Sequence, residues 1–197
     1  MQQPTDDDLG HAARGERAAL ERLVGEYYRP VAAYLARLID DPDEAQDLTQ
    51  EVFLRMARGL SRFERRAAFT TWLFQIARNV GVDALRRREA ANAVVASRAE
   101  THVGSRSNVE DFEDAEILWL CIGALNADLR SALLLRDLLG FTYREIAEIL
   151  DTTLATVKWR IFQARAKVQA SYLEASVPEE VGYRRFGPTR GAPGERS

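Results

Sequence analysis

Residues 141–170, FTYREIAEILDTTLATVKWRIFQARAKVQA, decide the fold that the sequence predicts. Thr142 followed by Glu145 is a capping box, which starts a helix by satisfying its first backbone N–H groups. The polar run 151–153 breaks the helical pattern and offers a threonine cap to a second helix. That helix carries four cations and no anion over 155–170. A short helix, a tight turn and a basic second helix are typical of a helix-turn-helix whose second helix enters the DNA major groove.

An ordinary helical hairpin with a solvated basic face is the alternative interpretation of this stretch. Two caps, a short turn and charge on one side of the second helix occur together here. An unrelated hairpin rarely supplies all of these features, so the DNA-binding interpretation is preferred.

The composition of the chain bounds its class. The 197 residues are enough for one or two small domains, and 46% of them are hydrophobic. The net charge is −3, so DNA binding must rest on local basic patches. The single cysteine, Cys121, excludes an internal disulfide and lies in an apolar run that predicts burial. No apolar run reaches the roughly 18 residues of a membrane helix, and the N-terminus is acidic and polar, so a cytoplasmic protein is expected.

The inventory of reactive residues does not favour an enzyme. His11 and His102 stand apart from cysteines and from carboxylates at metal-ligand spacing. The sequence contains no glycine-rich phosphate loop after a strand and no Gly-x-Ser-x-Gly nucleophile motif. No catalytic residue, metal or cofactor is therefore expected.

Helical spacing of apolar residues dominates the whole chain, so an all-α fold is predicted. Helices are expected over 6–14, 16–39 (with a kink or break at Pro30), 43–58, 69–88, 112–124 and 127–139, followed by Gly140 as a helix-ending residue. We expect a helical domain over 1–90, a flexible linker over 91–111, the helix-turn-helix domain over 112–175 and a disordered tail over 176–197.

Two upstream surfaces have a functional and a plain interpretation. The outer side of 43–58 is acidic and carries Leu54. This side is either solvated surface or a docking face for a basic partner, and the sequence favours neither interpretation over the other. The loop over 59–68 places arginines around Phe63, a pattern that suits single-stranded nucleic acid. A surface loop with Phe63 tucked into the core is the favoured interpretation when the loop is taken alone.

Three stretches point together to a family: 43–58 (DEAQDLTQEVFLRMAR), 69–88 (FTTWLFQIARNVGVDALRRR) and 141–165 (FTYREIAEILDTTLATVKWRIFQAR). The order and spacing of these stretches closely resemble those of the extracytoplasmic-function (ECF) class of bacterial RNA polymerase sigma factors. Members of this class are sigma-70 proteins that keep regions 2 and 4 only. The resemblance covers about residues 6–88 and 112–174. It implies two small helical domains on a flexible linker, the second a helix-turn-helix (winged-helix-like, four-helix) domain, and a non-enzymatic protein.

The resemblance also assigns roles to residues. A sigma factor binds core polymerase, recognises the −35 element as duplex, and melts and holds the −10 element. The residues implied to bind core polymerase are Asp47, Gln50, Glu51, Leu54 and Arg55. Those implied for −10 DNA are Arg62, Phe63, Arg65, Arg66, Trp72, Arg78, Asn79, Asp83, Arg86 and Arg87. Those implied for −35 DNA are Arg144, Thr153, Thr156, Lys158, Trp159, Arg160, Phe162, Gln163 and Arg165.

The implied partners are the β′ coiled coil and β flap of RNA polymerase, promoter DNA and, as in many relatives, an anti-sigma factor. The chain departs from the family at four positions of this motif. Asp151 stands where a turn glycine is usual, Thr152 where an apolar residue is usual, Trp159 where serine is usual and Gln163 where arginine or histidine is usual. Because glutamine suits adenine edges as arginine suits guanine, the −35 preference is expected to differ. A stand-alone helix-turn-helix regulator, which binds its operator without polymerase, is the alternative function.

Overall fold

The computed structural model describes residues 3–39, 41–96 and 114–176, and within these ranges every regular element is helical. The α-helices are α1 (Asp6–Ala13), α2 (Arg17–Ile39), α3 (Pro42–Gly59), α4 (Phe69–Ala96), α5 (Asp114–Gly123), α6 (Ala127–Leu133), α7 (Tyr143–Ile149) and α8 (Leu154–Ser176). A short 3-10 turn (Leu60–Arg62) follows α3, and a π-helical turn (Leu134–Leu138) follows α6. The all-α prediction is confirmed, and the described C-terminal part has four α-helices and no strand that could form a wing.

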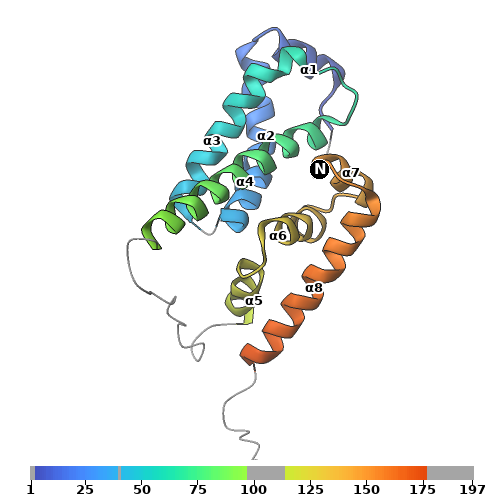
Figure 1. Ribbon diagram of the computed structural model, residues 1–197. Coiled ribbons are helices and arrows are strands. Elements are labelled where there is room, and N and C mark those ends of the chain that lie inside the picture. The colour runs from blue at the N-terminus through green and yellow to red at the C-terminus, as the bar shows by residue number, and fades with distance from the viewer. Residues whose placement is uncertain (1–2, 40, 97–113, 177–197) are drawn as a thin grey trace, which may run out of the picture.

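The N-terminal half, residues 3–96, packs α2, α3 and α4 side by side around one apolar core (Figure 1). The Asp41 side chain accepts a hydrogen bond from the Glu44 backbone N–H at 3.1 Å, and Pro42 occupies the first helical turn, so α3 begins where the sequence predicts. A kink or a break was expected at Pro30, and the break is wrong, because α2 is continuous. Tyr27 and Tyr34 on either side of the proline are fully buried, and that burial offsets the lost backbone hydrogen bond.

Helix α4 approaches α2 closely at Gly81. A Cβ atom there would lie 2.6 Å from Leu38 Cδ2, in a region where Leu38 is fully buried. The glycine thus lowers helix propensity but permits the contact between the two helices. Helix α4 also continues to Ala96, beyond the predicted end at Arg88, so the first residues of the expected linker are helical. The rest of the linker, 97–111, and the tail from 177 lie outside the described residues.

The C-terminal half, residues 114–176, contains the predicted helix-turn-helix as α7 and α8. Both bonds of the capping box are present: the Glu145 N–H donates to Thr142 Oγ1, and the Thr142 N–H donates to the Glu145 carboxylate. The Thr156 N–H donates to Thr153 Oγ1 at 3.1 Å and caps α8. In the turn between the helices Asp151 has a φ of +48°, the left-handed geometry for which glycine is usual.

Substitution at Asp151 tests this turn. Asp151→Val should lower the free energy of unfolding by about 1–2 kcal/mol, because a β-branched residue strongly resists a positive φ. Asp151→Gly should retain wild-type stability or exceed it, because glycine adopts that φ without steric cost. Urea unfolding of the two variants measures the difference. Equal stability of the valine and glycine variants would show that the turn has another geometry.

The two halves pack against each other, an arrangement that the sequence did not predict (Figure 1). The hydroxyl groups of Tyr34 on α2 and Ser131 on α6 share a buried hydrogen bond of 2.5 Å. Burial raises the pKa of Tyr34 to about 12, so this hydroxyl stays protonated at neutral pH. Arg130 donates to the Leu38 carbonyl at 2.8 Å.

Two further contacts extend the junction along α4 and α2. On α4, the Phe74 ring meets Phe141 edge-on at 5.1 Å between centroids. The Arg37 guanidinium of α2 lies 3.7 Å from the ring centroid of Trp119 on α5. The junction therefore combines aromatic contacts with buried hydrogen bonds.

Candidate nucleic-acid interface

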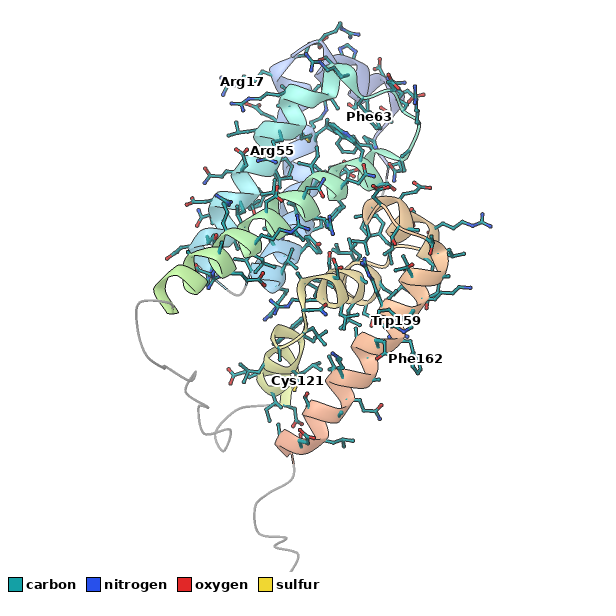
Figure 2. All side chains as sticks on the ribbon, in the orientation of Figure 1. Arg17, Arg55, Phe63, Cys121, Trp159 and Phe162 are labelled. Atoms are coloured by element: carbon teal, nitrogen blue, oxygen red, sulfur yellow. The ribbon has the colours of Figure 1, made fainter. Side chains whose placement is uncertain are left out.

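The acidic side of α3 is exposed, as the sequence predicts. Asp47 and Gln50 are exposed, and Leu54 retains 51% of its surface. Glu51 and Arg55 form an ion pair of 2.7 Å one helical turn apart (Arg55 is marked in Figure 2). All five residues implied for polymerase binding thus lie on one helix.

A hollow of about 470 Å³ joins this surface to α4. Glu51 and Arg55 line its α3 side, and Asp83, Arg86 and Arg87 line its α4 side. The family resemblance assigned the α3 residues to polymerase binding and the α4 residues to −10 DNA, whereas the fold brings both groups to one charged edge. Both signs of charge are present, so the edge can contact polar groups of a protein partner and phosphates of a nucleic acid.

The basic loop presents its cations outward and its aromatic ring inward. Phe63 stacks on Trp72 with 4.9 Å between ring centroids and packs against the core (Figure 2). The interpretation of Phe63 as a ring tucked into the core therefore holds in part, because the ring packs against the core but is only partly buried. Arg65 has a φ of +56° and is held by the Asp6 carboxylate at 2.8 Å, a contact that the sequence did not indicate. Arg66 pairs with Glu64 at 2.7 Å, and Arg62 is exposed.

The predicted DNA-binding residues of α4 separate into two groups. Asn79, Asp83, Arg86 and Arg87 are exposed. Arg78 is only 18% exposed and points into the junction between the halves, where its Nη2 lies 3.4 Å from an Asp128 carboxylate oxygen.

Asp128 is the residue at this junction that sequence reasoning missed. Its other carboxylate oxygen accepts from Arg160 of α8 at 2.7 Å, and the Arg160 side chain is 17% exposed. One carboxylate at the start of α6 thus holds an arginine implied for −10 DNA and an arginine implied for −35 DNA. The only sequence signal was an acidic residue in the first turn of a helix, a place where the helix dipole alone favours it.

The outer side of α8 carries exposed aromatic rings. Trp159 and Phe162 retain 58% and 68% of their surface and project outward from the helix (Figure 2). Lys158 is exposed beside them, and Gln163 is partly buried. Arg165 is bound to Asp137 at 2.6 Å, a contact that raises the pKa of its guanidinium.

The remaining residues implied for −35 DNA lie at the N-terminal ends of the motif. Arg144 is exposed on α7. Thr153 and Thr156 share a hydrogen bond of 2.8 Å between their hydroxyl groups at the start of α8. An exposed helix N-terminus of this kind can present backbone N–H groups to a phosphate.

Comparison with known proteins decides the family. Residues 23–91 match sigma-70 region 2, and residues 115–168 match sigma-70 region 4. The chain is 35% identical over 167 residues to the ECF RNA polymerase sigma-E factor of Escherichia coli K12, covering 79% of this chain and 87% of that protein. The chain belongs to the ECF sigma factors. It is also 34% identical over 168 residues to the RNA polymerase sigma-H factor of Pseudomonas aeruginosa, covering 79% and 86% of the two chains.

Solved structures agree with this ECF sigma fold. CnrH in complex with the cytosolic domain of CnrY has a TM-score of 0.65 at 25% identity, covering 86% of this chain and 97% of that one. RpoE of Bartonella quintana, solved with the anti-sigma factor NepR, has a TM-score of 0.64 at 23% identity, covering 80% and 98%, and supports the fold alone.

Membership in the family settles the broad function. As an ECF RNA polymerase sigma factor, the protein acts in transcription initiation, carries a DNA-binding region 4 and is not an enzyme. The stand-alone regulator that the sequence left as the alternative is therefore set aside. Within the described residues, none of the helices is both long and apolar enough to cross a membrane.

Proposed function

We propose that this ECF sigma factor divides promoter recognition among the three surfaces described above. The exposed side of α3 binds core polymerase, the basic loop with α4 holds the melted −10 element, and α8 meets the −35 element as duplex. The observation that carries the proposal is that most residues of the three surfaces are solvent-exposed on one folded chain, with the α3 and α4 surfaces adjoining at the hollow between those helices.

The polymerase contact is assigned to Asp47, Gln50, Glu51, Leu54 and Arg55 on α3. An exposed leucine among carboxylates suits a basic partner helix, and the β′ coiled coil of polymerase is the partner that the family resemblance implies. The β flap is assigned to the C-terminal half. Because polymerase and its DNA template are cytoplasmic in bacteria, we assign the protein to the cytoplasm.

The −10 contact is assigned to the loop that contains Arg62 and Arg66 and to the exposed end of α4. A base can be read on its edges only after it leaves the stack, and cations then follow the separated backbone. Phe63 and Trp72 form a stacked aromatic pair directly behind this loop, where an extruded base can pack.

We assign the packed arrangement of the two halves to the free protein, before it binds DNA. The −35 and −10 elements are about 25 base pairs apart by their names, or about 85 Å of duplex at 3.4 Å per base pair. Halves that share a hydrogen bond of 2.5 Å cannot reach both elements at once. We therefore propose that the halves separate when the protein engages polymerase and promoter. An anti-sigma factor, such as the one solved with the Bartonella quintana relative, could act by preventing that separation.

Lys158→Ala tests the −35 assignment. Lys158 is exposed on the outer side of α8, so its loss should leave the fold intact. We expect weaker promoter binding and a salt slope reduced by about one phosphate contact. Filter binding of the polymerase complex to a promoter across a range of salt concentrations measures both. An affinity and slope equal to wild type would remove Lys158 from the interface.

Run-off transcription with purified core polymerase tests the proposed function as a whole. Templates from the organism's own genome should give defined transcripts only when both core polymerase and this protein are present. Specific binding of an operator by the protein alone, with no effect of polymerase, would contradict the proposal.

A further inference from the structure

The outer side of α8 exposes apolar surface that the structure does not otherwise use. Phe162 and Trp159 are the two most exposed large hydrophobic residues among those described, at 68% and 58%. They are three positions apart on a helix, so their rings lie on neighbouring parts of one face. Gln163 follows Trp159 by four positions and shares that face. The outer face of the helix therefore offers two rings and a neutral amide.

The two arginines of α8 near these rings, unlike the rings, are paired with carboxylates of other helices. Arg160 donates to Asp128 at 2.7 Å and is 17% exposed. Arg165 places both Nε and Nη2 on the Asp137 carboxylate, at 3.1 and 2.6 Å. A carboxylate thus competes with guanine O6 and N7 for donors of each guanidinium, most strongly at Arg160, which is the more buried of the two. Lys158 is an exposed cation beside the rings, and it suits a phosphate as well as a base.

We infer that this face of α8 reads A·T base pairs of the −35 element, with thymine C5-methyl groups packed on Trp159 and Phe162 and an adenine edge bound by Gln163. The inference rests on the proposed −35 contact of α8 and specifies the bases that it prefers. Apolar side chains distinguish thymine in the major groove by its methyl group, and a glutamine amide matches the N6 and N7 atoms of adenine. The exposed arginine beside Phe162, Arg165, is paired with Asp137, so its guanidinium is already engaged in the free protein.

Removing single methyl groups from the DNA tests the inference. Promoter duplexes are prepared with one −35 thymine at a time replaced by uracil, which lacks only the C5-methyl group. Binding of the complex of core polymerase and this protein should weaken about fourfold at each position whose methyl group is buried, from the transfer free energy of one such group. The same replacement in the spacer between the elements should have no effect.

Variants connect the methyl effect to the protein. Trp159→Ala should bind the thymine promoter more weakly and lose the difference between thymine and uracil at one position. Leu173→Ala is the matched control, because Leu173 is 57% exposed on the same helix but lies beyond the motif. Gln163→Arg should change the preferred base at one position from adenine to guanine when promoters are selected from a library with a randomised −35 element.

The outcomes separate the inference from the proposed function. Selection of A·T pairs together with a methyl effect that Trp159→Ala abolishes supports the inference. Specific transcription from selected guanine-rich −35 elements, with no uracil effect, overturns the inference and leaves the proposed function intact. Unchanged methyl sensitivity in Trp159→Ala also overturns it. Absence of any promoter-specific transcript overturns both.

Discussion

Glu51→Lys is expected to weaken binding to core RNA polymerase by about thirtyfold or more. Glu51 lies in the middle of the acidic side of α3 and pairs with Arg55 at 2.7 Å. Reversal of a charge at a protein interface replaces an attraction with a repulsion, and truncating one partner of a buried pair already costs about 2–5 kcal/mol. Competition binding against a labelled sigma factor measures the affinity for core polymerase.

Glu21→Lys is the matched control for this variant. Glu21 pairs with Arg17 at 2.7 Å, also one helical turn apart, on α2. Exposed pairs of this kind contribute about 0.3–0.5 kcal/mol, so both variants should fold like the wild type. If Glu51→Lys and Glu21→Lys bind core polymerase equally well, the acidic side of α3 is solvated surface and not a docking site.

Phe74→Ala is expected to lower the free energy of unfolding by about 3–5 kcal/mol. Phe74 is fully buried on α4, and its ring meets Tyr34 at 5.8 Å and Phe141 at 5.1 Å between centroids. The side chain therefore supports the core of the N-terminal half and the junction with the C-terminal half together. Urea unfolding measures the loss.

A double-mutant cycle isolates the junction from the core. Phe74→Leu, Phe141→Leu and the double variant keep an apolar side chain at each position, so each should fold. Aromatic pairs in contact couple by about 0.5–1.5 kcal/mol, and we expect a coupling energy in that range. Strictly additive effects would contradict the packed arrangement of the two halves.

The local part of the fold was predictable because its signals are local. The capping box at Thr142 and the cap at Thr153 involve residues three positions apart, and both are present in the structure. The positive φ of Asp151 agrees with the glycine that is usual at this position in the family. The continuity of α2 through Pro30 was not predictable, because it depends on burial against α3 and α4 that no short window contains.

The contacts between the halves were not predictable for the same reason. Tyr34 and Ser131 are 97 positions apart, and each taken alone resembles an ordinary core residue. Arg78 and Arg160 both matched DNA-binding positions, yet in the free protein both are held by Asp128. Separation of the halves would release Arg78, whereas the Arg160–Asp128 pair lies within the C-terminal half and does not depend on the junction.

Permanganate probing of promoter DNA tests the central claim most directly, because the reagent oxidises unpaired thymines. We expect reactive thymines at the −10 element only when core polymerase and this protein are both present, with protection of the −35 duplex in the same complex. Arg62→Ala combined with Arg66→Ala should reduce the −10 reactivity while the −35 protection remains. Reactivity at −10 without this protein, or none with it on promoters that it protects at −35, would contradict the account.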